Sequence, residues 1–432
     1  MKKIFVGGLM SCGVHSEGDM IKSLVKSYSK YEIVNDYKVA DVIIIIDTCM
    51  STYNNILKSI DYVESVLRDK KEESFVVVSG CLAREIKFEL SDRYKNILNQ
   101  VTCVKFDNII EYVAKLIGGH LSTSLLENFK LPYTLIPNGI EVSPVRGCYN
   151  HCSFCKSNYM DYSLSSVPYQ YLEKMAIDID SLSSYGLPIN YISICASNLS
   201  LYGVDLYKKR KCHEAIRMLT SPETIKFTEV GALINWYPEL VEEILRNPKI
   251  KSVFTSLESG SERIYNLMNR PIKLDKLIEI IKLIRKERPD ILINTEFICG
   301  YPTETIDDLK RTIDLVYELD VNPQFMHPYC NSLQIPSSKL PQHSVEYCTK
   351  SVGYAKEQLI GLRNKFKNFV DNGEMFVIDK DDLLGIYEVM LIDGSIRNIR
   401  MDQFDRKYEI DELIPSNMVK CRQLIRRQVN RI

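Results

Sequence analysis

The order of strand-like and helix-like segments predicts an α/β protein in three parts. Short β-branched runs alternate with amphipathic stretches over residues 1–120, which is typical of a doubly wound parallel sheet. After a linker over residues 121–140, six βα repeats over residues 141–370 favour a partial (β/α)6 TIM barrel, whose active site would lie on the loops after the strands. Residues 371–432 are expected to form a small C-terminal α+β or β domain.

The N-terminal part is expected to contain strands Ile4–Leu9, Val42–Ile46 and Phe75–Val78, separated by helices over Glu17–Lys30 and Thr52–Lys70. Each strand is a short apolar run, and each helical stretch has an apolar face at a spacing of three to four residues. The Ser/Leu-rich stretch that follows, residues 118–137, predicts the linker.

The barrel strands are expected where short apolar or β-branched runs recur, at Glu141–Val145, Asn190–Cys195, Lys226–Val230, Ser252–Leu257, Ile291–Ile298 and Gln324–Tyr329. Amphipathic helices are expected between them, at Pro238–Arg246, Leu274–Arg288 and Thr305–Leu319 among others. Helical sequence over Ser344–Val370 closes the barrel. Beyond it, Ile386–Ile399 is expected to form a hairpin around an Asp-Gly turn.

The composition excludes several classes of protein. Among 432 residues, 45% are hydrophobic, which is too many for a disordered or fibrous chain, and 55 Lys+Arg balance 56 Asp+Glu. This balance gives no general basis for binding nucleic acid or an anionic membrane. The longest apolar run is too short to span a membrane, and the N-terminus is too short for a signal peptide. Thirteen cysteines in a cytoplasmic chain are expected to serve metal or redox chemistry.

Three cysteines stand at equivalent places in the N-terminal part. Cys12, Cys49 and Cys81 follow the three expected strands in turn. Because the carboxyl ends of parallel strands lie at one edge of a sheet, these thiols are expected to face a common site. The alternative is that each is a buried small hydrophobic residue, as free cysteines often are.

A second set of cysteines follows the first barrel strand. Cys148, Cys152 and Cys155 form a CxxxCxxC run within the segment RGCYNHCSFC. An iron–sulfur cubane usually takes four thiolates, so three closely spaced cysteines would leave one iron open to another ligand. A structural zinc site would normally need a second CxxC pair, so zinc is the weaker alternative.

The two cysteine triads together resemble the radical S-adenosylmethionine (SAM) methylthiotransferase family over residues 1–345, as a divergent member. Further segments support the resemblance: Asp47-Thr48-Cys49, Gly80-Cys81-Leu82-Ala83-Arg84, Leu201-Tyr202-Gly203, Ser256-Leu257-Glu258-Ser259-Gly260-Ser261, Met268-Asn269-Arg270 and Gly300-Tyr301-Pro302-Thr303-Glu304-Thr305. The resemblance implies two [4Fe–4S] clusters and SAM as cofactors. It also implies a flavodoxin- or ferredoxin-like electron donor.

According to this resemblance, the Cys148/Cys152/Cys155 cluster cleaves SAM reductively, and the deoxyadenosyl radical removes hydrogen from an unactivated carbon. The second cluster, at Cys12/Cys49/Cys81, carries sulfur that is methylated by a second SAM and transferred. The cofactors perform the difficult chemistry, while the protein sets distances and excludes water. Both clusters must therefore face one site.

Other residues are candidates for binding SAM: Phe154, Asn198, Glu258, Ser259, Arg270 and Pro302. Glu258 ends a barrel strand, where most family members carry Gln; its carboxylate could instead stabilise a helix start. Arg270 could bind a carboxylate or be a solvated charge at a helix end. Asn198 and Tyr202 could line the site or pack the loop. The remaining seven cysteines are expected to be ordinary buried thiols: Cys103, Cys195, Cys212, Cys299, Cys330, Cys348 and Cys421.

Two departures from the family bear on the substrate. Residues 156–163 replace an arginine-containing segment, and the C-terminal part lacks the signature of the RNA-binding TRAM domain usual at this position. Residues 371–415 carry seven more acidic than basic residues, whereas residues 416–432 are basic. We therefore expect a polypeptide substrate, either a ribosomally made peptide or a ribosomal protein. The alternative is a tRNA adenosine-37 type substrate.

Two other classes of protein are considered. A cobalamin-dependent radical SAM methyltransferase would also place an α/β domain before the barrel, but it would need an Asp-x-His-x-x-Gly loop. His15 has Gly13 in place of that Asp. A non-enzymatic zinc or scaffold protein would bind zinc or no metal at its cysteines.

Overall fold

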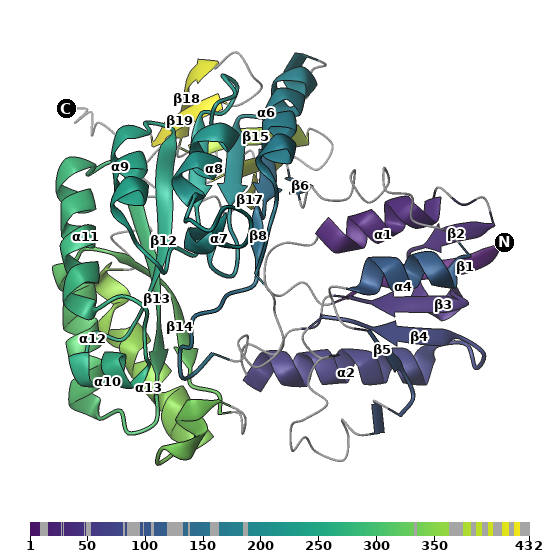
Figure 1. Ribbon diagram of the computed structural model, residues 1–432, viewed down its shortest axis with the longest axis horizontal. Helices are drawn as coiled ribbons and strands as arrows, with labels where there is room; N and C mark the ends of the chain where they lie inside the picture. The colour runs from purple at the N-terminus through teal and green to yellow at the C-terminus, as the bar shows by residue number, and fades with distance from the viewer. Residues whose placement is uncertain are drawn as a thin grey trace, which may run out of the picture.

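The computed structural model describes most of the chain up to residue 362 and five strands beyond it. The described residues are 1–8, 16–26, 28, 30–46, 48, 53–80, 83, 96–97, 99–104, 108–118, 133–136, 139–155, 164–184, 189–331, 335–362, 375–381, 386–390, 396–400, 408–413 and 419–423. The expected α/β fold is confirmed, with a parallel N-terminal sheet, a larger sheet of the partial-barrel type and a C-terminal antiparallel sheet (Figure 1).

The N-terminal sheet has five parallel strands in the order β2-β1-β3-β4-β5. The strands are β1 (Lys2–Gly7), β2 (Tyr31–Val34), β3 (Val42–Ile45), β4 (Phe75–Val78) and β5 (Thr102–Cys103), with the short 3-10 helix η1 at Tyr37–Val39. Helices α1 (Ser16–Lys26) and α4 (Ile109–Leu116) pack on one face, and α2 (Tyr53–Asp69) packs on the other. Helices on both faces make the sheet doubly wound.

The second sheet has the order β14-β13-β12-β11-β10-β7-β6. Six parallel strands follow one another: β7 (Gly139–Val142), β10 (Tyr191–Ile194), β11 (Phe227–Val230), β12 (Ile250–Glu258), β13 (Leu292–Cys299) and β14 (Asn322–Pro328). All six correspond to strands expected from the sequence. The strand β6 (Tyr133–Ile136) pairs antiparallel with β7, so this part of the expected linker belongs to the sheet.

Helices cover the outer face of this sheet and bury its apolar side chains. They are α6 (Tyr169–Ser184), α8 (Cys212–Leu219), α9 (Pro238–Arg246), α11 (Leu274–Glu287), α12 (Ile306–Glu318) and α13 (Val345–Gln358). Shorter elements lie in the strand-end loops: β8 (Val145–Arg146), β9 (Ser165–Ser166), η5 (Leu199–Leu201), α7 (Val204–Tyr207), α10 (Glu262–Leu267) and η6 (Pro336–Lys339).

The C-terminal sheet is antiparallel, in the order β17-β16-β15-β19-β18. Its strands are β15 (Met375–Asp381), β16 (Ile386–Met390), β17 (Ile396–Arg400), β18 (Tyr408–Leu413) and β19 (Val419–Gln423). The expected hairpin over Ile386–Ile399 is confirmed by the pairing of β16 with β17. Of the helices described, none combines the length and apolar character needed to cross a membrane.

Candidate functional site

The CxxxCxxC run forms a loop that follows β8 at the carboxyl end of β7. Gly147 turns the chain into this loop with a φ of 80°, a backbone conformation that residues with a Cβ rarely adopt. Ser153 then anchors the loop, because its N–H donates to Met268 O at 2.9 Å and its hydroxyl lies 2.8 Å from Tyr301 Oη. These contacts tie the cysteine loop to the end of α10 (Glu262–Leu267) and to the turn after β13.

A network of three asparagines lies beside Cys148. Asn198 Nδ2 donates to Cys148 Sγ at 3.4 Å and to Asn235 Oδ1 at 2.6 Å. Asn150 also donates from its side chain to Asn235 Oδ1 at 2.7 Å, and its backbone N–H lies 3.4 Å from Cys148 Sγ. All three asparagines are buried. Since Asn198 Oδ1 has no hydrogen-bond partner among the described residues, this amide still offers a buried acceptor beside the thiol.

Arg270 lies beside Cys152. Its Nη1 is 3.3 Å from Cys152 Sγ, its Nη2 donates to Ser256 O at 3.0 Å, and Nη1 is 3.6 Å from Glu258 Oε1. The guanidinium carbon also lies 5.8 Å from the centre of the Phe154 ring. The arginine side chain is 3% exposed, which excludes the solvated helix-end charge considered from the sequence.

Glu258 ends β12 in the left-handed backbone region, with a φ of 63°. The register with β13 shifts at the same point, between Ser256 and Glu258. The residue lies four positions before α10, so its carboxylate does not cap that helix; it faces Arg270 instead. Burial raises the pKa of Glu258, and Arg270 opposes this rise.

A second, half-buried carboxylate lies one strand away. Glu296 of β13 accepts a hydrogen bond from Ser256 Oγ at 2.7 Å, and its other oxygen lies 3.3 Å from His327 Nε2 of β14. The hydrogen bond with Glu296 raises the pKa of His327. Strands β12, β13 and β14 therefore present charged groups next to the arginine that contacts the cysteine loop.

These residues fit an iron–sulfur cluster. The described residues contain no group of three His, Cys, Asp or Glu side chains arranged to hold a single metal ion. A cubane is larger than one ion and spaces its thiolates more widely, so the environment of the thiols is the more relevant test. Cys148 and Cys152 each receive N–H donors on sulfur, as cluster thiolates commonly do. Burial raises the pKa of Cys152 to about 11, so iron must displace its proton on binding.

The other predicted cofactor residues lie close to this loop in sequence or structure. Ser259 is buried, with its hydroxyl 3.4 Å from Thr312 Oγ1 of α12. Pro302 is buried in the turn after β13, next to Tyr301, which contacts Ser153. Tyr202 packs the loop, because its hydroxyl donates to Val167 O at 2.6 Å. Cys12, Cys49 and Cys81 lie outside the described residues.

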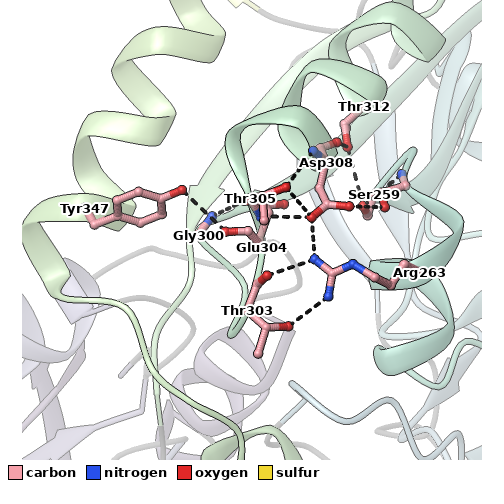
Figure 2. Close-up of polar contacts among 10 residues, drawn as sticks. Ser259, Arg263, Gly300, Thr303, Glu304, Thr305, Asp308, Thr312 and Tyr347 are labelled. Atoms are coloured by element: carbon pink, nitrogen blue, oxygen red, sulfur yellow. Dashed lines mark hydrogen bonds and ion pairs between the residues drawn. The ribbon is translucent and has the colours of Figure 1, made fainter.

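A polar network joins the turns after β12 and β13 (Figure 2). Thr305 is the N-cap of α12 and forms a capping box with Asp308. Asp308 also pairs with Arg263, which donates a hydrogen bond to Thr303 O at 2.8 Å. Beside this network, Gly300 N–H donates to Glu304 Oε2 at 2.5 Å and Tyr347 Oη lies 3.4 Å from Glu304 O. The network thus fixes the two turns that follow the strands bearing Glu258 and Glu296.

Glu304 predicts a pH-dependent stability of the barrel. Burial raises its pKa from 4.5 to about 8, against the opposing Gly300 hydrogen bond. The folded state therefore binds a proton at Glu304 more tightly than the unfolded state does. This proton stabilises the fold fully below pH 4.5, and the stabilisation is lost as the pH rises towards 8. Between pH 5 and 8, the free energy of unfolding of the wild type should fall by about 2–4 kcal/mol relative to that of Glu304→Gln. Urea unfolding followed by fluorescence of Trp236, the chain's only tryptophan, measures this difference. Equal pH profiles of the two proteins would contradict it.

Several residues of the site were not found from the sequence. Asn150 and Ser153 lie within the CxxxCxxC segment but were not singled out, and Asn235, Glu296 and His327 lie in or after barrel strands without any motif. Asn198 follows a barrel strand, and Asn235 follows the next barrel strand in the same way, so the same position after a strand could have identified Asn235. Among the seven cysteines expected to be ordinary thiols, Cys212, Cys299 and Cys348 are buried, and Cys103, Cys195 and Cys330 are half-buried. The side chain of Cys421 is outside the description.

Comparison with known families gives two matches along the chain. The model described as the radical SAM superfamily matches residues 142–316, which include Cys148, Cys152 and Cys155. The model described as uncharacterized protein family UPF0004 matches residues 11–101, which include Cys12, Cys49 and Cys81. The two matched segments thus contain one cysteine triad each.

Curated relatives carry two kinds of name. The ribosomal protein uS12 methylthiotransferase RimO of Clostridium botulinum is 26% identical over 84% of this chain and 81% of its own length. That of Clostridioides difficile is 28% identical over 72% of each chain. The tRNA-2-methylthio-N(6)-dimethylallyladenosine synthase of Thermotoga petrophila is 29% identical over 64% of this chain and 63% of its own.

Solved structures share the fold. The cobalamin-dependent SAM radical enzyme OxsB aligns with a TM-score of 0.51 at 12% identity, over 83% of this chain and 56% of that structure. The radical SAM methyltransferase TsrM from Kitasatospora setae aligns with a TM-score of 0.51 at 11% identity, over 78% of this chain and 75% of that structure. At such low identity, these similarities establish the architecture alone.

Proposed function

Because the chain belongs to the radical SAM methylthiotransferase family, we propose that it replaces an unactivated C–H hydrogen of a polypeptide with a methylthio group. The observation that carries this proposal is the anchored loop of Cys148, Cys152 and Cys155, with donors on two of its sulfurs. The family's [4Fe–4S] clusters and SAM supply the electron, the radical and the methyl group. The residues of this chain bind, orient and shield these groups.

In this proposal Cys148, Cys152 and Cys155 hold one cluster and leave one iron open for SAM. Asn198 supports Cys148, and its unpartnered Oδ1 is available to accept a hydrogen bond from SAM. Glu258 and Arg270 offer a carboxylate and a guanidinium to the charged ends of SAM, while Phe154, Ser259 and Pro302 shape the surrounding turns. Cys12, Cys49 and Cys81 hold the second cluster, which carries the sulfur.

The proposal assigns one task to each part of the chain. Residues 1–120 form the domain of the second cluster, residues 121–140 connect it, residues 141–370 form the catalytic barrel and residues 371–432 recognise the substrate. The proposal includes a cytoplasmic location, since the cysteines must remain reduced until iron binds. It also includes a flavodoxin- or ferredoxin-like protein as the electron donor.

A polypeptide is favoured over tRNA on the grounds of charge. Residues 371–415 contain twelve acidic and five basic residues, and this acidic stretch includes four of the five C-terminal strands. Such a stretch repels phosphates, whereas RNA binding depends on clustered Lys and Arg. The tRNA alternative retains support from relatives with that name and from the basic residues 416–432. The cobalamin-dependent alternative has only the fold likeness, because His15 is not preceded by the required Asp.

The substrate prediction can be tested with the reduced holoenzyme and SAM. We expect a mass increase of one methylthio group, about 46 Da, on ribosomal proteins or on peptides encoded beside the gene, detected by peptide mass spectrometry. Total tRNA, digested to nucleosides and analysed in the same way, should remain unchanged.

The matched control is the same reaction with Cys12, Cys49 and Cys81 replaced by Ala, which should yield no methylthio product on either substrate. Modified tRNA with unmodified polypeptide would overturn the substrate assignment but would leave the chemistry intact. Deoxyadenosine formation without a methylthio product on any substrate would contradict the proposed function itself.

A further inference from the structure

We propose that Arg270, together with the opposing charge of Glu258, sets the reduction potential of the cluster bound by the CxxxCxxC loop. The inference rests on the proposed function, since it concerns the cluster that this loop would hold. It goes further by giving the two charged residues a role in electron transfer, beyond any contact with SAM. Glu258 opposes this effect through its own charge, while Ser256 O holds the guanidinium in place.

The geometry places one cation between two groups that carry or can carry negative charge. Arg270 Nη1 lies 3.3 Å from Cys152 Sγ and 3.6 Å from Glu258 Oε1. The side chains of Arg270 and Glu258 are only 3% and 8% exposed, so water screens these charges weakly. Nη2 is fixed by Ser256 O, which leaves the guanidinium little freedom to turn away from the sulfur.

The backbone at Glu258 is shaped to make this contact. The residue has a φ of 63°, where side chains with a Cβ are disfavoured, and the strand register shifts beside it. A regular strand would alternate its side chains from one face to the other at each residue. The irregular strand end brings the Glu258 carboxylate to the arginine. Backbone strain of this kind is typical of positions that a functional site constrains.

The sign of the effect follows from electrostatics. Reduction adds one negative charge to the cluster, and a nearby cation stabilises that charge, so Arg270 raises the reduction potential. A hydrogen bond to a ligand sulfur acts in the same direction. Glu258, when ionised, places a negative charge beside the arginine and therefore lowers the potential. Removing the two charges one at a time should therefore move the potential in opposite directions.

The test uses the full-length, two-cluster holoenzyme at one fixed pH above neutrality, with a redox titration followed by electron paramagnetic resonance. In Arg270→Gln, the ratio of reduced to oxidised cluster at the wild-type midpoint should fall about tenfold, which equals a shift of about −59 mV for a one-electron couple. Glu258→Gln should shift the same midpoint to higher potential. The midpoint of the other cluster should not move in either variant. If the two signals overlap, replacing Cys12, Cys49 and Cys81 with Ala isolates the loop cluster.

Two further variants control the result. Arg217→Gln removes a guanidinium that pairs with Glu243 on helices α8 and α9, and it should leave both midpoints unchanged. Arg270→Lys keeps the charge and should lie closer to the wild type than Arg270→Gln. The inference would be overturned if the midpoints of both variants were unchanged or shifted in the same direction. It would also be overturned if Arg270→Gln lost its iron and the midpoint of Glu258→Gln did not shift. The proposed function would still stand if the wild type binds about eight irons and forms the methylthio product.

Discussion

Replacing Cys148, Cys152 and Cys155 together with Ala should lower the iron content from about eight to about four per chain and abolish SAM cleavage. The structure gives the reason, because these three thiols lie on one anchored loop and two of them are buried against amide and guanidinium donors. Without them, neither the cluster nor its open iron can form. Iron and sulfide analysis after anaerobic reconstitution, with chromatography of deoxyadenosine, measures both effects.

Two matched variants separate this effect from a general loss of structure. Replacing Cys12, Cys49 and Cys81 should remove a similar amount of iron and the methylthio product but preserve deoxyadenosine formation. Cys212→Ala alters a fully buried thiol on α8 and should leave the iron content unchanged. A wild-type plateau near four irons would contradict the two-cluster assignment, and a colourless zinc-loaded protein would support the scaffold alternative.

The sequence predicted the fold well where apolar runs were long and regular. Strand β4 and helix α9 have the expected bounds, and the six parallel barrel strands were all found. Several edge strands were missed, among them β2, β5 and β6. Tyr31–Val34 has no fully buried residue, so its alternation is weak, and Tyr133–Ile136 is a short strand beside a Ser/Leu-rich stretch. Short edge strands depend on their neighbours more than on their own sequence.

The site was predicted less completely, because local patterns do not report which side chains meet in space. The CxxxCxxC spacing located three cysteines, but it could not show that Arg270, 115 residues after Cys155, contacts Cys152. Equally, nothing in the segment around Glu258 reveals its left-handed backbone, which arises from the shifted pairing with β13. Burial of a charged pair is a property of the assembled barrel.

Gly300→Ala should destabilise the barrel by about 3 kcal/mol or more. Gly300 begins the turn after β13 with a φ of 76°, and a Cβ there would lie 2.6 Å from Cys348 Sγ and 2.8 Å from its Cα. The second atom belongs to the backbone of α13, so a change of rotamer cannot relieve the contact. Either α13 moves outward or the turn changes, and the second response breaks the hydrogen bond to Glu304. Urea unfolding followed by Trp236 fluorescence reports on the barrel, because this side chain is buried in its core.

Gly353→Ala is the matched control on the same helix. Gly353 lies within α13, and a Cβ there would meet no atom of the described residues within 4 Å. Since alanine is the better helix former, this change should stabilise the helix by about 0.5–1 kcal/mol. The two substitutions add the same methyl group but should shift the urea midpoint in opposite directions. Equal midpoints for the two variants would mean that α13 does not constrain the turn after β13. A large loss of stability in Gly300→Ala should also lower iron retention, because Tyr301, the next residue, contacts Ser153 of the cysteine loop.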